Sequence, residues 1–312
     1  MAEPTRYEDW LLFAGAAHLD DIARSASPLI AKASNTVTWS QSVGGVAANA
    51  ACAAAQTTGA SMQICFQGAV GDDVLAVRLE TTLQQQGLHC SLQHIEGQAT
   101  GRYSAIMDHD GELYLGLSDV ALAEQFNAAS VSAALLGGYC KGIMLDTNLS
   151  ESCIESVIDS ANQRGVPVAA IGVSPLKCQR LTSSAKKLDI LFCNRLEAIA
   201  MINARQAADI AGDTDPVNLA DSLAQLGFRQ FVLTDASAPI IVQSHEARVS
   251  IPVTATARTQ TVNGAGDALA GSSFAAWCSG QTLSKAVSDV GLRAAQQIVS
   301  GERQAPVFVT QS

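Results

Sequence analysis

The chain has 312 residues, of which 48% are hydrophobic, so it can bury a sizeable core. Its formal net charge of −10 argues against a binding surface for nucleic acid or for an anionic membrane. The N-terminus lacks a signal-peptide pattern, no run of about 18 apolar residues occurs, and the eight cysteines form no C-x-x-C pair. We therefore expect a cytoplasmic protein without disulfides, a zinc site or a membrane span.

Strand-like and helical segments alternate along the chain. Apolar runs predict strands at 10–15, 62–68, 142–146, 166–171, 188–193 and 230–234. Helical patterns cover 46–58, 73–86, 151–164, 195–201, 217–226, 267–278 and 284–299. Such alternation predicts a parallel sheet with helices on both faces. No linker rich in Pro, Ser or Gly divides the sequence, so we expect residues 1–312 to form a single domain.

One region departs from this alternation. Residues 103–107 and 113–117 are β-like and flank Asp110-Gly111, a dipeptide typical of hairpin turns. The run 36–40 is also β-like. Taken alone, these segments are edge strands or a hairpin outside the main sheet.

The most informative stretch is Thr261-Val262-Asn263-Gly264-Ala265-Gly266-Asp267, which is followed by a helix of small residues. Glycines let backbone N–H groups approach a ligand closely, and a helix start adds unpaired N–H groups and the positive end of a dipole. Together these features predict an anion site. Asp267 is suited to take the proton of a hydroxyl that attacks a phosphoryl group, and the alternative is a helix N-cap.

Other motifs accompany this stretch. Asp20 follows a strand that ends in Gly15, Gly44-Gly45 precedes a helix that carries Asn49, and residues 190–193 lead into Asn194-Arg195-Leu196-Glu197. In order and spacing, over residues 11 to 301, these motifs resemble those of the ribokinase/PfkB family of carbohydrate and nucleoside kinases. There is no Walker A motif, which excludes the P-loop route to phosphoryl transfer.

The resemblance implies a fold, an activity and partners. The fold is a ribokinase-like three-layer α/β sandwich, with a central, mostly parallel sheet and a small β-sheet lid from segments near 16–45 and 98–118. The activity is that of an ATP-dependent phosphotransferase that binds a small sugar or nucleoside, with Mg²⁺ and a possible monovalent cation as cofactors. The lid often doubles as a dimer interface, so a homodimer through the lid is expected.

The resemblance also assigns roles at the reacting centre. Asp267 becomes the catalytic base, and Gly264, Ala265 and Gly266 supply N–H groups to the transferred phosphoryl group. For the acceptor, the residues expected to hold the sugar are Asp20, Gly44, Gly45 and Asn49.

Asp20 is expected just past the end of the first strand, where a carboxylate can accept hydrogen bonds from two hydroxyls. The alternatives are a surface acid for Asp20 and a polar helix-face residue for Asn49. The neighbouring Asp21 is expected to be a surface loop acid.

The resemblance gives nucleotide-binding roles to Asn194, Thr234, Asn263 and Lys177. Glu197 would help to place Mg²⁺, mostly through water. The pair Asn194 and Glu197 also resembles a helix capping box, and both interpretations can hold together.

The sequence departs from the family pattern near the nucleotide. Thr261 stands where the family has Asp, and Asn263 replaces a common Thr. The segment 234–239 contains no glycine, although the family has a Gly-bearing nucleotide loop there. These departures imply that the nucleotide is bound differently from the family pattern, or that ATP is not the only phosphate donor.

Two further segments indicate a subgroup. Asp146-Thr147-Asn148-Leu149 and Val173-Ser174-Pro175-Leu176-Lys177 look like segments of pseudouridine kinases and their close relatives. This similarity implies that Asn148 lies near the acceptor and Lys177 near the mouth of the site. The alternatives are an N-cap for Asn148, with Ser150 as competitor, and a solvated cation for Lys177.

The leading hypothesis is therefore a pseudouridine 5′-kinase. A kinase for another nucleoside or a free sugar, and a catalytically weak relative that binds such ligands, are the alternatives.

Overall fold

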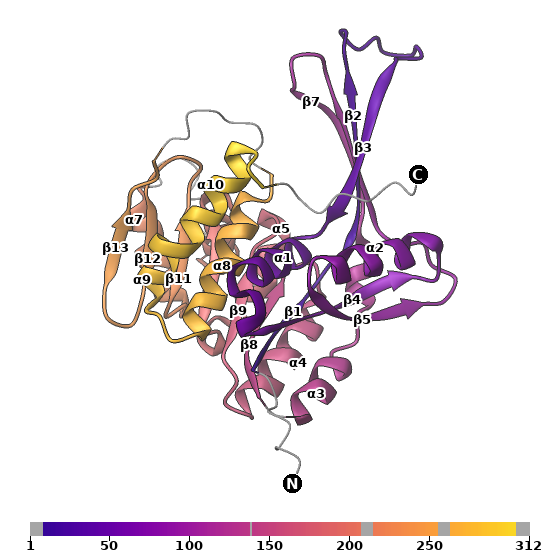
Figure 1. Cartoon of the computed structure of the whole chain (residues 1–312). Coiled ribbons are helices and arrows are strands. Elements are labelled where there is room, and N and C mark those ends of the chain that lie inside the picture. Colours follow the sequence, from indigo (N-terminus) through magenta and orange to yellow (C-terminus); the bar gives the residue numbers. More distant parts are fainter. Residues whose placement is uncertain (1–8, 138, 207–214, 255–262, 304–312) are drawn as a thin grey trace.

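The computed structural model describes residues 9–137, 139–206, 215–254 and 263–303 (Figure 1). A sheet of nine strands crosses the molecule, and its neighbouring strands are parallel except at one edge, where β12 is antiparallel to both β11 and β13. In spatial order the strands are β13 (Arg248–Ile251), β12 (Ile240–Gln243), β11 (Phe231–Thr234), β10 (Ile190–Asn194), β9 (Val168–Ile171), β8 (Cys140–Asp146), β1 (Trp10–Ala14), β4 (Gln63–Gly71) and β5 (Leu88–Ile95).

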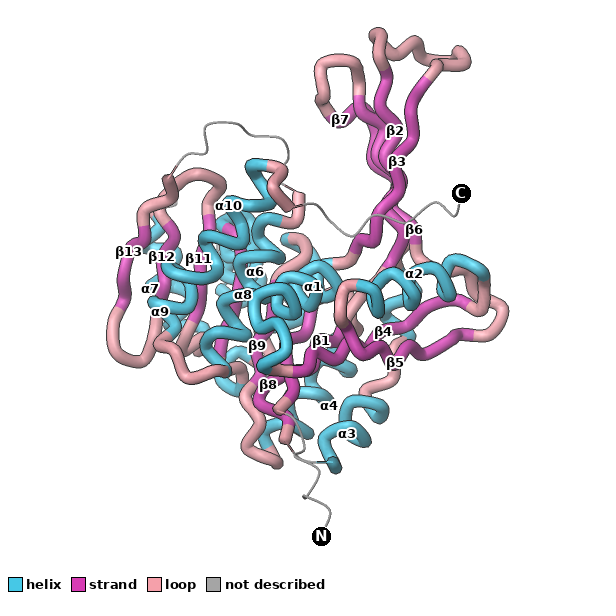
Figure 2. Tube along the Cα trace, in the orientation of Figure 1, coloured by secondary structure: helices cyan, strands magenta, loops and turns pink. Residues whose placement is uncertain are grey.

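Helices cover both faces of this sheet (Figure 2). One face carries α1 (Val46–Thr58), α2 (Val74–Gln85), α8 (Ala265–Cys278), α9 (Leu283–Lys285), a π-helical segment η6 (Ala286–Gly291) and α10 (Leu292–Ser300). The other face carries α3 (Ala129–Ala134), α4 (Glu151–Asn162), α5 (Pro175–Cys178), α6 (Arg195–Gln206) and α7 (Pro216–Leu226). Each helical layer shares an apolar cluster with the sheet, so the predicted three-layer α/β sandwich is confirmed.

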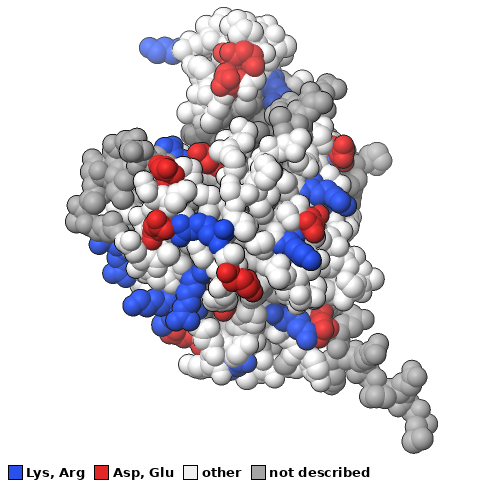
Figure 3. Space-filling view, turned by 90° about the vertical axis from the view of Figure 1, so that its left-hand side faces the viewer, with Lys and Arg blue, Asp and Glu red and all other residues white. Residues whose placement is uncertain are grey.

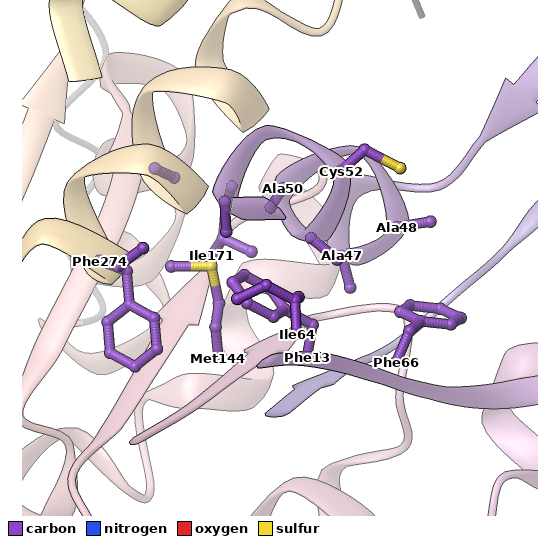
Figure 4. Packing of buried hydrophobic residues seen from close by; sticks show 14 of the residues in the cluster. Phe13, Ala47, Ala48, Ala50, Cys52, Ile64, Phe66, Met144, Ile171 and Phe274 are labelled. Carbon is purple, nitrogen blue, oxygen red and sulfur yellow. The ribbon is translucent and has the colours of Figure 1, made fainter. Parts of the chain in front are cut away.

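The central strands are buried on both faces, which explains why they are continuous apolar runs rather than alternating ones. In β1, Leu12 faces one apolar cluster while Leu11 and Phe13 face the other. Phe13 and Met144 of the sheet pack beneath Ala47 of α1, beside Phe274 of α8 (Figure 4). Alanine on the inner face of α1 lets this helix lie close to the sheet.

Helices α1 and α8 touch backbone to backbone. A Cβ at Gly271 of α8 would collide with the carbonyl oxygen of Ala50 in α1. The two helices are also linked through Thr57 Oγ1, which donates to Ser272 Oγ at 2.8 Å. This contact fixes the distance between α1 and α8, and both helices carry residues that the sequence assigns to the site.

A second sheet of four strands projects away from the main body (Figure 1). Its order is β3 (Val37–Gly44), β2 (His18–Ser25), β6 (Arg102–Met107) and β7 (Leu113–Asp119). Strands β6 and β7 form the expected antiparallel hairpin, and the β-like run 36–40 belongs to β3. We call this sheet the lid sheet.

Several expectations were wrong or incomplete. Asp20 does not follow the first strand in a loop but lies within β2 of the lid sheet. Asp21 is 7% exposed rather than a surface loop acid, because it accepts from Gln41 Nε2 and pairs with Arg102 Nε at 3.1 Å. Helix α8 begins at Ala265, two residues before the expected start. Strand β2 was expected only as part of the lid segment near 16–45, and strands β5, β12 and β13 were not predicted, because they are polar edge strands or only four residues long.

Charged side chains are spread over the surface. On the face drawn in Figure 3, acidic and basic side chains are interspersed, so opposite charges partly compensate one another there. Of the helices in the described residues, none combines the length and the apolar character needed to cross a bilayer.

We predict that Gly271→Ala lowers the melting temperature. Alanine gains about 1 kcal/mol of helix propensity over glycine, but overpacking against the Ala50 backbone costs about 1–3 kcal/mol because that backbone cannot rotate away. Thermal unfolding followed by circular dichroism measures the change. Gly137→Ala is the control, since a Cβ there would meet nothing within 4 Å. Equal melting temperatures for the two variants would contradict the close helix contact.

Candidate active site

The residues assigned from the sequence gather at one edge of the main sheet, where the lid sheet joins it. Asp146, Asn194 and Thr234 end the parallel strands β8, β10 and β11. The N-termini of α1 and α8 lie at the same edge, because Asn49 of α1 contacts Asp267 of α8. Ligands of open α/β sheets bind at this edge.

The N-terminus of α8 is built for close backbone approach. Its N-cap is Gly264, whose φ of 80° lies in the left-handed region that favours glycine. Glycine has no side chain, so no cap occupies the N–H groups of the first turn at this position. Ala265 and Gly266 follow in the first turn, where backbone N–H groups point out of the helix end. Asp267 lies in the first turn rather than at the N-cap, so it does not cap the helix.

Asp267 is partly buried and accepts a hydrogen bond from α1. Asn49 Nδ2 donates to Asp267 Oδ2 at 2.9 Å. Burial raises the pKa of Asp267 to about 7, the Asn49 hydrogen bond opposes this rise, and the negative charges of Asp146, Glu197 and Asp20 add to it. A carboxyl group with a pKa near neutrality is suited to act as a general base.

Buried polar atoms without partners surround this group. Among the described residues, the buried atoms without a hydrogen-bond partner include Asp20 Oδ1, Asn49 Oδ1 and His18 Nδ1. His18 Nδ1 lies 3.0 Å from Asp20 Oδ1, but the pair lacks hydrogen-bond geometry. Two of these atoms are acceptors, so a ligand that brings hydroxyl donors would satisfy them.

The two glycines before α1 make room for this arrangement. Gly44 ends β3 opposite His18, and a Cβ there would collide with the carboxylate of Asp20. Gly45 is the N-cap of α1 with a φ of 110°, and a Cβ there would collide with the carbonyl oxygen of Ala16. Both positions therefore require glycine for spatial reasons.

Asn148 and Lys177 form a pair. Asn148 is buried, and its Oδ1 accepts from Lys177 Nζ at 2.7 Å. Desolvation lowers the pKa of Lys177, so this side chain is not a freely solvated cation. The N-cap of α4 is Ser150, which leaves Asn148 without that function. The structure thus groups Lys177 with Asn148, the residue expected near the acceptor.

Asn194 and Glu197 have the geometry of a capping box. Asn194 N donates to Glu197 Oε2 at 2.9 Å, and Glu197 N donates to Asn194 Oδ1 at 3.0 Å. Burial raises the pKa of Glu197. Thr234 lies beside Asn194 in the parallel ladder of β10 and β11, and Asn263 is exposed directly before Gly264. Thr261 and Val262 lie outside the described residues.

Because these hydrogen bonds occupy Glu197 Oε2 and Asn194 Oδ1, the pair fits a hydrated cation held through water better than one bound directly. Within the described part of the chain, the cluster of three metal-ligand side chains is Asp108, His109 and Asp110 on the lid hairpin, away from these acids.

The comparison with known proteins decides the family. Residues 17–306 match the profile of the pfkB family carbohydrate kinases. This chain belongs to the PfkB family. It is therefore a carbohydrate-kinase-type phosphotransferase.

Individual relatives of this PfkB kinase share its length. It is 26% identical over 292 residues to a pseudouridine kinase of Escherichia coli, covering 90% of this chain and 88% of that one. A carbohydrate kinase structure from Agrobacterium tumefaciens has a TM-score of 0.79 and 24% identity, covering 96% and 94%. An Arabidopsis thaliana ribokinase complexed with ribose and ATP has a TM-score of 0.74 and 18% identity, covering 94% and 92%. These likenesses agree with the ribokinase-like fold.

Sequence reasoning missed two residues of this site. His18 lies on β2 two residues before Asp20, within the segment that leads from the first strand to Asp20, but it received no role. Asp146 was part of a quoted motif but received no role, although it is fully buried. A lone acid at the end of an apolar strand, as in residues 142–146, was the available signal.

We predict that Asn49→Leu raises the pKa of Asp267 above about 7. Leucine has a similar shape and keeps the site dry, but it removes the hydrogen bond that stabilises the carboxylate, so the proton is held to higher pH. Carboxyl ¹³C NMR titration measures the shift. Thr57→Val is the control, because Thr57 also links α1 to α8 but does not contact Asp267. A pKa in Asn49→Leu at or below that of the wild type would refute the prediction.

Proposed function

We propose that this PfkB kinase transfers the γ-phosphoryl group of ATP to the 5′-hydroxyl of pseudouridine. The observation that carries the proposal is the pair of buried acceptors, Asp20 Oδ1 and Asn49 Oδ1, which accept no hydrogen bond within the described part of the chain. Ribosyl hydroxyls are donors of the matching kind. Both residues also influence Asp267. Asn49 donates a hydrogen bond to it through Nδ2, and the negative charge of Asp20 raises its pKa.

In this proposal Asp267 accepts the proton of the attacking hydroxyl. The hydroxyl oxygen forms a bond to the γ-phosphorus while the bond to the β,γ-bridging oxygen breaks, and ADP leaves with that electron pair. The backbone N–H groups of Gly264, Ala265 and Gly266 face the negative charge that develops. Asn194, Thr234 and Asn263 would hold the nucleotide. A hydrated Mg²⁺ near Glu197 and Asn194 would neutralise phosphate charge when bound.

The choice of pseudouridine rests on narrower support. The E. coli relative is named a pseudouridine kinase, and the pair Asn148–Lys177 lies in the segments that resemble that subgroup. Pseudouridine differs from uridine by a carbon-linked base that leaves an extra ring N–H. A pocket that pairs this N–H leaves a buried acceptor unsatisfied when uridine binds, and so discriminates against uridine.

We predict that kcat/KM is higher for pseudouridine than for uridine, ribose or fructose, by about 5- to 150-fold. This range corresponds to about 1–3 kcal/mol for one unsatisfied buried polar group. ADP release with ATP and Mg²⁺, measured side by side for the four acceptors, tests it. A free sugar or uridine as the best acceptor would overturn the choice of pseudouridine and leave the kinase family intact.

Asp267→Asn is the matched control for this assay. The amide cannot accept the proton, so turnover should fall by roughly 10²–10⁴-fold while the KM for the acceptor changes little. Turnover near the wild-type value would exclude Asp267 as the base. Wild-type ADP release no greater than that of Asp267→Asn for every acceptor would instead indicate a ligand-binding relative.

We also propose that two copies pair through the lid sheet. Along β2, Asp20 and Ala23 point to opposite faces, and the cross-strand partner of Ala23 is Trp39. Trp39 is 59% exposed, and Leu115 and Leu117 of β7 are 44% and 55% exposed on its face. A hollow of about 380 Å³ beside Trp39 and Tyr114 could receive such side chains. A second copy would bury this apolar face and leave the Asp20 face free.

We predict that the double substitution Leu115→Lys with Leu117→Lys halves the mass measured by light scattering after size exclusion. Lysine on the lid face removes apolar contact area and adds like charges across a symmetric interface. Leu196→Lys is the control, because Leu196 is 61% exposed on α6 of the main body. A wild-type protein with the mass of one chain would refute the proposal directly.

A further inference from the structure

The side chain of Asp146 is a carboxylate enclosed by hydrogen-bond donors. It ends β8 and is 0% exposed. Its Oδ2 accepts from Ala16 N at 3.1 Å, Ala47 N at 3.0 Å and Asn148 Nδ2 at 3.3 Å. Its Oδ1 accepts from Asn148 N at 2.8 Å. Since all four partners donate, the group is suited to be ionised and not to be a neutral acid or an amide.

The donors belong to segments that carry candidate acceptor residues. Ala16 lies in the link from β1 to β2, four residues before Asp20. Ala47 is in the first turn of α1, two residues before Asn49, and the N-cap Gly45 has no side chain to serve that turn. Asp146 therefore caps α1 from a different strand, and one carboxylate ties three acceptor-side segments together.

The space around Asp146 is closed. A Cβ at Gly15 would collide with the Asp146 carboxyl group and with Ala47 Cβ. The glycine that ends the first strand thus makes room for this carboxylate against α1. A displacement of Asp146 would be passed directly to α1, because no free volume separates them.

Charged groups of several elements face this position. Lys177 of α5 binds the same Asn148, and Arg180 donates to the backbone carbonyls of residues 147–149. Asp267 of α8, Asp20 of β2 and Glu197 of α6 are the acids that share the site. Burial raises the pKa of Asp146, and its hydrogen bonds from Ala47, Asn148 and Ala16 oppose this.

We propose that Asp146 is a positioning residue of this kinase, whose buried carboxylate holds Asp20, Asn49 and Asn148 in register around Asp267. The proposal rests on the acceptor site and base proposed above. Asp146 need not touch the acceptor, because its effect passes through the three segments that it binds. Its negative charge also favours the protonated form of Asp267.

Asp146→Asn tests the proposal. An amide of the same shape must turn its NH₂ group toward at least one buried N–H donor, so the segments separate. We expect the KM and the calorimetric Kd of the best acceptor to rise about tenfold or more. We also expect the pH midpoint of kcat/KM to move to higher pH, because separation of the segments weakens the Asn49 hydrogen bond, which lowers the pKa of Asp267 more than the charge of Asp146 raises it.

Asp189→Asn is the matched control. Asp189 Oδ2 accepts from Val168 N at 2.7 Å, so this carboxylate also serves the main sheet, but it precedes β10 at the opposite end from Asn194. We expect a loss of stability without a change in acceptor affinity or pH midpoint. If Asp146→Asn folds and matches Asp189→Asn in both readouts, the positioning role is refuted.

Gly15→Ala provides a second route should Asp146→Asn fail to fold. It keeps the charge but pushes the carboxylate, so acceptor KM and Kd should rise, and the pH midpoint should rise with them as the Asn49 hydrogen bond weakens. An unchanged Kd in Gly15→Ala would also overturn the proposal. A wild type that phosphorylates none of the four acceptors would refute the proposed function instead, and the calorimetric Kd then still reports on Asp146.

Discussion

The contact between α1 and α8 is the constraint on which the site depends. Both helices pack on the same face of the sheet, and they approach so closely that Gly271 meets the backbone of Ala50. One residue before Ala50 and four residues before Gly271, Asn49 and Asp267 share a hydrogen bond of 2.9 Å. The close packing of the two helices fixes the relative positions of these two side chains.

The lid sheet brings a further group to this pair. Asp20 reaches the site from β2, and its cross-strand neighbour is Ser42 on β3, two residues before Gly44. Successive residues of a strand point to opposite faces, so one face of the lid sheet carries Asp20 while the other carries Trp39. Strands β2 and β3 therefore carry Asp20 on the face toward the site. On the opposite face they carry the exposed Trp39 together with the pair of Asp21 and Gln41.

Much of this arrangement could be predicted from the sequence, because the informative features were local. Small residues before Asp267 marked a helix start, and apolar runs marked the buried strands of a parallel sheet. The unpredicted features depend on distant contacts. Asp21 is buried against Gln41 and Arg102. Lys177 donates a hydrogen bond to Asn148, which lies 29 residues earlier in the sequence. No periodicity in the sequence encodes such pairs, because they arise only when β2, β3 and β6, or β8 and α5, come together.

The electrostatics of the site has a consequence for its ligands. Asp20, Asp146, Glu197 and Asp267 converge, and their mutual repulsion together with burial accounts for the pKa of about 7 at Asp267. A phosphate donor would add further negative charge beside them. The N–H groups at the start of α8 offer only partial positive charge, and Lys177 is already bound to Asn148. In the proposed phosphoryl transfer a cation would offset this negative charge, and its charge would also lower the pKa of Asp267 and favour the proposed base role at neutral pH.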